Sequence, residues 1–210
     1  MSPSDAPPPP AELPVHVAAA AGGCGPELEA LMAAHPGAVA AEDASGYLPL
    51  HHACAHGHAP TAQMLVAAHP QGVHQRAVGG LLPLHVAVAS QCTRDVTDLV
   101  TMLLTSGPEA ATSPDRRGRL PLHVAAAGGA TIAVVRALLA ADRRTAAALD
   151  AAGQTPAHCA AAKVDHADTL ALLLDVNPQV RTVTPRGSGT TAQCVLTRLP
   201  CCTSPGCPRG

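Results

Sequence analysis

The sequence contains no tryptophan and no phenylalanine, and Tyr47 is its one tyrosine. Aromatic side chains fill the cores of many globular domains and line many small-molecule pockets. The hydrophobic share still reaches 47%, and most of it is alanine, leucine and valine. Small side chains of this kind favour thin helices packed in close layers, and they build no roomy pocket. We therefore expect no bound cofactor.

Charge of either sign is scarce as well. Charged residues make up 13% of the chain and the formal net charge is -2. Binding to nucleic acid or to an anionic membrane surface usually needs an excess of positive charge, so we expect neither partner. The apolar runs, such as Val86 to Ala89, are much shorter than the roughly 20 residues of a membrane helix. No membrane span is predicted.

The amino terminus lacks the features of a secretory signal. Residues 1–12 carry no positive charge and contain the proline run Pro7 to Pro10, which is typical of a tether. A ligand for a proline-recognising domain is the less favoured alternative. Cys54 and Cys159 lie at small-residue positions of predicted helices, where buried free thiols explain them better than disulfides do. We expect a cytoplasmic protein, with the nucleus left open.

What the sequence does contain is one repeated unit. Its clearest copy begins with a turn at Gly118 and a short helix opened by Pro121, followed by a break at Gly128-Gly129. A second helix follows, with apolar pairs at helical spacing over Val134 to Leu139. The four-residue opening recurs about every 35 residues. The openings are Leu13-Pro14-Val15-His16, Leu48-Pro49-Leu50-His51, Leu82-Pro83-Leu84-His85, Leu120-Pro121-Leu122-His123, Thr155-Pro156-Ala157-His158 and a degenerate Thr190-Thr191-Ala192-Gln193.

These copies predict one elongated repeat domain over residues 13–196, with five clear units and a degenerate sixth. A disordered proline-rich leader over residues 1–12 and a disordered, Cys- and Pro-rich tail over residues 197–210 flank it. Dipeptides such as His35-Pro36 and His69-Pro70 are expected to end the second helices, because proline pushes the preceding residue out of the helical region. Unit 3 is longer, and its extra residues fall in Ser90 to Asp95.

The period and the Pro-x-His opening resemble the ankyrin repeat, with its T-P-L-H-x-A signature, over roughly Leu13 to Leu196. The resemblance implies an all-α solenoid of stacked helix-turn-helix units with short turn or hairpin tips. It also implies a non-catalytic scaffold that binds other proteins. In the family the repeated histidine is structural and hydrogen-bonds groups around the adjoining turn. The corresponding residues are His16, His51, His85, His123 and His158.

The resemblance further implies that a partner protein binds the turn tips and the concave ends of the first helices. Interfaces draw most of their energy from a few Tyr, Trp and Arg anchors. The candidate residues are Tyr47, His56, Arg116, Arg117, Arg119 and Arg186. We expect a monomer that docks an acidic or mixed segment of the partner along units 2 to 4. The alternative is that the arginines only keep an alanine-rich surface soluble.

A cluster of histidines and cysteines is the remaining candidate for chemistry. His52 and His56 are four residues apart, a spacing at which two imidazoles on one helix can bind a transition metal. Further ligands would have to come from His58, His85 or Cys54. The tail offers Cys201, Cys202 and Cys207 without paired C-x-x-C spacing.

We favour no metal site, because His51 and His58 already match repeat positions. No catalytic motif is present, so we expect no enzyme. Two alternatives stay open: an ankyrin segment of a larger signalling or membrane protein, and a metal- or redox-responsive protein. The degenerate sixth unit favours the first of these.

Overall fold

The computed structural model describes residues 14–90, 96–162 and 166–178. Within them the chain forms pairs of antiparallel helices and no strand. The α-helices are α1 (Pro14–Ala21), α2 (Pro26–Ala34), α3 (Pro49–Ala55), α4 (Ala59–Ala68), α5 (Pro83–Ala89), α6 (Thr97–Ser106), α7 (Pro121–Gly128), α8 (Ile132–Ala141), α9 (Pro156–Ala161) and α10 (Ala167–Val176). The all-α fold predicted from the repeats is confirmed.

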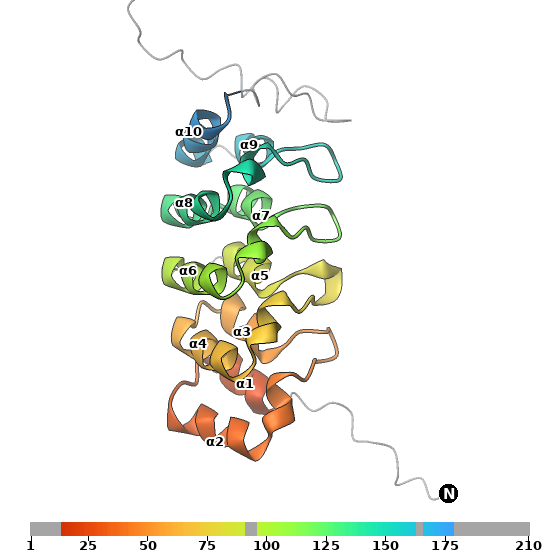
Figure 1. The fold of residues 1–210 in the computed structure, drawn as a ribbon, viewed down its shortest axis with the longest axis vertical. Coiled ribbons are helices and arrows are strands. Elements are labelled where there is room, and N and C mark those ends of the chain that lie inside the picture. Colours follow the sequence, from red (N-terminus) through yellow and green to blue (C-terminus); the bar gives the residue numbers. More distant parts are fainter. Residues whose placement is uncertain (1–13, 91–95, 163–165, 179–210) are drawn as a thin grey trace, which may run out of the picture.

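The helices stack in two columns (Figure 1). The first helices α1, α3, α5, α7 and α9 lie in one column, and the second helices α2, α4, α6, α8 and α10 lie in the other. Each first helix packs against the first helix of the next unit. Because every contact is made with a neighbouring layer, the molecule grows along one axis and needs no central core.

Proline explains where the first helices begin. It occupies the first position of all five, where its fixed φ suits a helix and its missing N–H costs no hydrogen bond. This proline is buried in α3, α5, α7 and α9 but exposed in α1, because no described unit precedes α1. The comparison shows that each unit covers the start of the next one.

Helices α2, α4, α6 and α10 end at the proline dipeptides that were expected to stop them, but after α2, α4 and α6 the chain continues in a short 3-10 turn, and such a turn also follows α8. These turns are η1 (Pro36–Val39), η2 (Pro70–His74), η4 (Pro108–Thr112) and η5 (Arg143–Ala147), and a further turn η3 spans Val78–Gly80. At η5 no proline is present, and the Oδ1 atom of Asp142 instead accepts the N–H of Arg144 at 2.8 Å. The prediction of a plain helix stop was therefore incomplete.

The core is a continuous apolar seam between the two columns. Leu28, Leu65, Leu103, Leu138 and Leu173 of the second helices are all 1% exposed or less. Opposite them lie small residues of the first helices, such as Ala53 and Ala125, which are fully buried. Each fully buried leucine contributes about 1.5 to 3 kcal/mol. The many alanines let the helices approach closely, as their abundance in the sequence suggested.

The sequence predicts helices over Pro49 to His56 and Pro60 to His69, and three of these four boundaries differ from the structure by one residue. Helix α3 ends at Ala55, and α4 begins at Ala59 and ends at Ala68. The predicted insertion at Ser90 to Asp95 lies almost entirely outside the described residues, as do the leader, the sixth unit and the tail.

Candidate functional site

The repeated histidines join each unit to the next. In α7, the Nδ1 atom of His123 accepts the N–H of Leu120 at 3.2 Å, so the neutral ring carries its proton on Nε2. That Nε2–H donates to the carbonyl oxygen of Gln154, 3.1 Å away at the start of unit 5. The same Nε2 contact runs from His16 to Tyr47 (3.1 Å), from His51 to Leu81 (3.3 Å) and from His85 to Arg119 (3.1 Å).

In His51, His85 and His123 both ring nitrogens are thus bound to backbone groups, whereas Nδ1 of His16 is buried without a hydrogen-bond partner among the described residues. Burial lowers the pKa of His51 to about 4, and the hydrogen bond to the Leu81 carbonyl opposes that shift only in part. Burial likewise lowers the pKa of His16, His85 and His123. A neutral, buried imidazole with two backbone partners is suited to positioning the chain. It is not available as a metal ligand or a proton-transfer group.

The carbonyl groups that these histidines bind belong to four turn segments, which we call tips. Tip 2 is residues 43–47, tip 3 is 77–81, tip 4 is 115–119 and tip 5 is 150–154, each numbered after the unit whose first helix follows. In tip 4 the Oδ1 atom of Asp115 accepts the N–H groups of Arg117 (2.8 Å) and Arg119 (2.9 Å). Asp43 and Asp150 make the equivalent pair of bonds in tips 2 and 5.

A glycine closes each of these tips. Gly118 has a φ of 71°, a left-handed conformation that other residues adopt at a cost. A Cβ atom on Gly118 would lie 2.8 Å from the backbone nitrogen of Ala151 in tip 5. Tip 3 departs from the pattern, because Ala77 replaces the aspartate and both Gly79 and Gly80 have positive φ.

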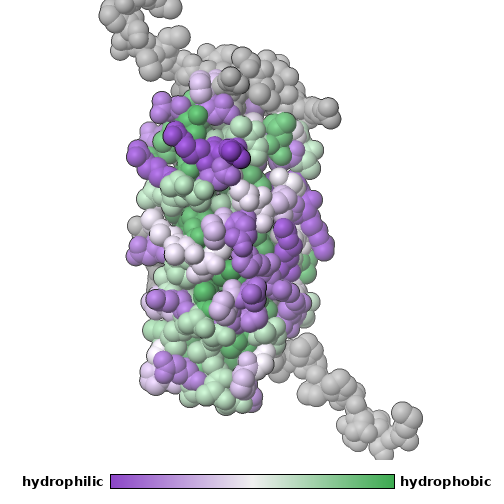
Figure 2. All heavy atoms as spheres, viewed as in Figure 1, coloured by the Kyte–Doolittle hydropathy of each residue, from purple (hydrophilic) through white to green (hydrophobic). Residues whose placement is uncertain are grey.

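Neighbouring tips are connected through their backbones. The N–H of Arg116 donates to the carbonyl oxygen of Gly79 at 2.9 Å, and the N–H of Ala151 donates to that of Arg117 at 3.0 Å. Tips 3, 4 and 5 therefore form one continuous edge (Figure 1). Figure 2 shows hydrophilic side chains gathered along the middle of this edge.

A groove of about 670 Å³ opens where tips 4 and 5 meet the exposed sides of α7 and α9. We call the exposed sides of the first helices, together with the tips, the inner face. Arg116, Arg117 and Arg119 line one side of the groove. The remaining lining residues are mostly small, and they are His123, Ala127, Asp150, Ala151, Ala152, Gln154, Cys159 and Ala162.

The predicted anchors fall into two groups. Arg116 and Arg117 are exposed, and Arg119 lines the same groove, so the structure brings these three together. Tyr47 lies farther along the inner face and is half-buried. Its ring packs edge-on against the ring of His51, with 5.4 Å between the two ring centroids, and its backbone carbonyl oxygen accepts the hydrogen bond from Nε2 of His16. Tyr47 thus has a clear structural role in joining units 1 and 2.

The other two predicted residues do not join the groove. His56 is exposed at the end of α3, where its ring stacks on that of His58 at a centroid distance of 6.0 Å. Arg186 lies outside the described residues. Sequence reasoning placed Asp115 and Asp150 in the predicted tips but not among the anchors, and it did not place Cys159 at this site. The recurrence of Asp-x-x-Gly at Asp43, Asp115 and Asp150 is the signal that could have shown the structural role of these aspartates.

The candidate metal ligands of the histidine cluster contact different groups and do not converge on one point. The Nε2 atom of His52 lies 2.8 Å from Oδ2 of Asp43, and the Nε2 atom of His58 lies 3.2 Å from the Ala20 carbonyl oxygen. Cys54 is fully buried in the core, where burial raises the pKa of its thiol. Over residues 14–90, 96–162 and 166–178, no three His, Cys, Asp or Glu side chains are grouped as metal ligands. The three tail cysteines fall outside these residues.

Stacked helical hairpins with projecting tips define the molecule as a repeat solenoid with an elongated edge of tips. A family model of ankyrin repeats, three copies long, matches residues 15–109 and again residues 84–183. The chain belongs to the ankyrin repeat family, whose members generally mediate protein–protein interaction. A search of the curated proteins finds no match. Among the described helices, none is long and apolar enough to cross a membrane.

Proposed function

We propose that this protein is a non-catalytic scaffold that binds a partner protein through its tips and inner face, inside the cytoplasm or nucleus and as a monomer. The observation that supports this proposal best is the groove between tips 4 and 5. Its walls come from four separate segments of two units, and it carries three of the arginines expected to anchor a partner.

The rigidity of the edge also favours binding. Backbone bonds hold Arg116 and Arg117 to the neighbouring tips, and the His85 and His123 imidazoles hold the carbonyl ends of tips 4 and 5. A preorganised surface loses less conformational entropy when it binds, so more of the contact energy appears as affinity.

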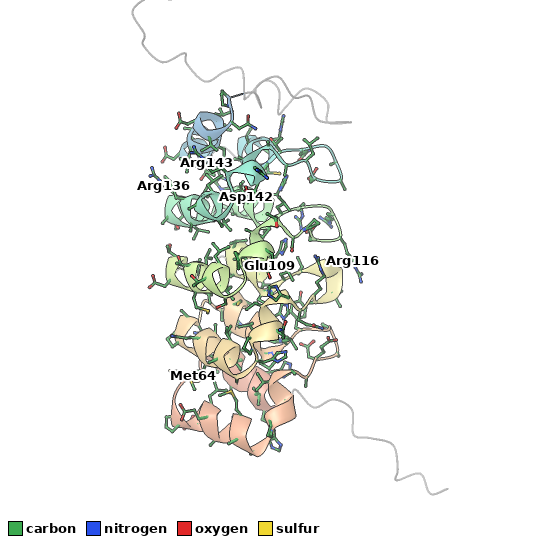
Figure 3. All side chains as sticks on the ribbon, in the orientation of Figure 1. Met64, Glu109, Arg116, Arg136, Asp142 and Arg143 are labelled. Carbon is green, nitrogen blue, oxygen red and sulfur yellow. The ribbon has the colours of Figure 1, made fainter. Side chains whose placement is uncertain are left out.

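Two double variants test the proposal. Arg116→Glu with Arg117→Glu reverses charge on tip 4, and we call it the tip 4 variant. Arg136→Glu with Arg143→Glu makes the same change on α8 and at the start of the following turn η5, and we call it the α8 variant. Figure 3 shows Arg116 on the tip edge and Arg136 on the far side of the stack, on α8. All four arginines are exposed, so all four substitutions are expected to leave the fold intact.

The measurement is affinity purification from a cell extract followed by quantitative mass spectrometry. We expect partner recovery to fall by about tenfold or more with the tip 4 variant, as when a charge pair is lost from an interface. Recovery should stay unchanged with the α8 variant. A partner retained by the tip 4 variant and lost from the α8 variant would place binding on the second helices and overturn the proposal.

A further inference from the structure

The three arginines of the groove differ in what holds them. Nε and Nη2 of Arg119 both bind the Oδ2 atom of Asp115, at 2.9 and 2.8 Å. A guanidinium has five N–H donors in a fixed planar fork, so this pairing orients the group and leaves other donors available. The Arg119 side chain is 30% exposed and lines the groove. It is therefore a cation held in place at the groove wall.

The side chains of Arg116 and Arg117 are exposed instead, and only the backbones of these residues are held by hydrogen bonds to neighbouring tips. Among the described residues neither makes an ion pair. Arg119 pairs with Asp115, and the other close contacts of this kind join the imidazoles of His52 and His74 to the carboxylates of Asp43 and Glu109. Tip 4 therefore carries two guanidinium groups without an ion pair, those of Arg116 and Arg117, close to the Arg119 guanidinium that Asp115 holds in place.

The carboxylates near this tip are already engaged. Asp115 is 2% exposed at its side chain and binds Arg119 together with two backbone N–H groups. The Oδ1 atom of Asp150 accepts the N–H groups of Ala152 and Gln154. Arg76 adds a further cation, since its Nη1 donates to the Pro114 carbonyl oxygen at 2.6 Å beside tip 4. Four arginines against two aspartates make this region positive in a chain of net charge -2.

The floor of the groove is small and apolar. Four alanines with short side chains line it, and Cys159 lies half-buried among them. The alanines are Ala127, Ala151, Ala152 and Ala162. Burial raises the pKa of the Cys159 thiol to about 11, so the thiol is neutral and adds to the apolar floor. The groove lining includes no Phe, Tyr or Trp, and the ring of His123 is fully buried, so no exposed ring is present on which a nucleic-acid base could stack. An extended peptide could instead place small apolar side chains there.

We propose that the segment recognised by this groove is an acidic peptide. One carboxylate pairs with the free edge of Arg119, and a flanking carboxylate pairs with Arg116 or Arg117. Its apolar side chains lie on the alanine floor between α7 and α9. This inference rests on the proposed function, because it specifies the chemistry of the partner that the inner face binds.

The experiment is a selection of random dodecapeptides displayed on phage, carried out against the full chain. A parallel selection uses the Arg116→Glu, Arg117→Glu variant, and the Arg136→Glu, Arg143→Glu variant is the matched control. Thermal unfolding of all three proteins checks that each is folded. Selected peptides are then synthesised with Asp and Glu, or with Asn and Gln in their place, and their binding is measured by fluorescence anisotropy.

We expect wild type and the α8 control to select peptides rich in Asp and Glu, and the tip 4 variant to lose that preference. Replacing the acids by amides should weaken binding by about tenfold or more, and so should added salt, because the pairs are partly exposed. An oligothymidylate of similar charge should bind more weakly than the peptides.

Peptides that bind the inner face but show no acidic preference would overturn this inference and leave the proposed function standing. Selected peptides that bind the tip 4 variant as well as wild type would count against both, and so would a selection that yields no peptide. Equal binding of the oligothymidylate would show a general anion-binding surface and would also overturn the inference.

Discussion

A hydrogen bond of 3.1 Å joins the imidazole Nε2 of His85 in α5 to the backbone carbonyl oxygen of Arg119 in tip 4. The residue that lines the proposed binding groove is therefore positioned by a buried side chain of the preceding unit. Stacking and binding are linked at this contact, since whatever disturbs the histidine also disturbs the tip.

Replacing His85 by alanine should lower the free energy of unfolding by about 2 to 4 kcal/mol. The change leaves the buried N–H of Leu82 without a partner, and it removes one of the two hydrogen bonds that the Arg119 carbonyl oxygen accepts, the other coming from the N–H of Asp115. Urea unfolding followed by circular dichroism measures the effect. His56→Ala is the control, because His56 is exposed, and it should change stability by less than about 0.5 kcal/mol. Equal losses in the two variants would refute a structural role for His85.

Stability should fall as the pH drops from about 6.5 towards 4. Burial holds the native pKa of His51 near 4, below the ordinary value of 6.5. Below pH 6.5 the unfolded chain therefore binds protons that the native protein does not, which favours unfolding by about 1.4 kcal/mol per pH unit for each such histidine. The lowered pKa values of His16, His85 and His123 act in the same direction.

Urea unfolding at a series of pH values tests this dependence. The His51→Gln variant is less stable near neutral pH but should lose stability less steeply, because glutamine takes up no proton. Burial raises the pKa of the Asp43 and Asp115 carboxylates, but hydrogen bonds together outweigh it and hold the pKa below the ordinary value of 3.8. Their contribution to stability changes only below about pH 5, so the histidine effect is measured between pH 7 and 5. A free energy of unfolding that stays constant between pH 7 and 5 would show that the histidines are not held neutral.

Gly118→Ala should destabilise the protein by about 1 to 2 kcal/mol or more. Its φ is 71°, and the added Cβ would meet the Ala151 backbone nitrogen at 2.8 Å. Gly128→Ala is the matched control, because it lies in α7 with no atom nearer than the Val88 carbonyl oxygen at 3.8 Å. That change should be neutral or stabilising by up to about 1 kcal/mol. Thermal unfolding in which both variants behave alike would contradict the tip geometry.

Leu120→Thr should leave stability within about 1 kcal/mol of wild type. In unit 5 the threonine at this position places its hydroxyl 2.7 Å from Nδ1 of His158, and the same bond could form to His123. The leucine is 8% exposed, so the gain of a hydrogen bond is offset by lost apolar burial. A shift of the urea midpoint that corresponds to several kcal/mol would show that Leu120 has another role.

The helix pairs could be predicted from sequence because their signals are local. Proline at the first helical position, the apolar spacing of the second helices and the His-Pro stops all lie within one unit. The 3-10 turns after those stops were missed, since a proline that ends one helix also suits the first position of the next turn.

The candidate site was harder to predict, because its contacts cross between units. The carbonyl partner of each histidine lies 30 to 34 residues further along the chain, and only the stacking geometry identifies it. Arg119 was chosen as an anchor from its residue type and its place in a predicted turn tip. Its pairing with Asp115 depends on the fold of tip 4, which no helical spacing rule describes.

Hydrogen–deuterium exchange on the chain bound to its purified partner tests the central claim most directly. We predict that binding slows exchange in tips 4 and 5 and in α7 and α9, while α4, α6 and α8 exchange as in the free protein. Slowed exchange confined to α4, α6 and α8, with tips 4 and 5 unchanged, would contradict binding through the inner face.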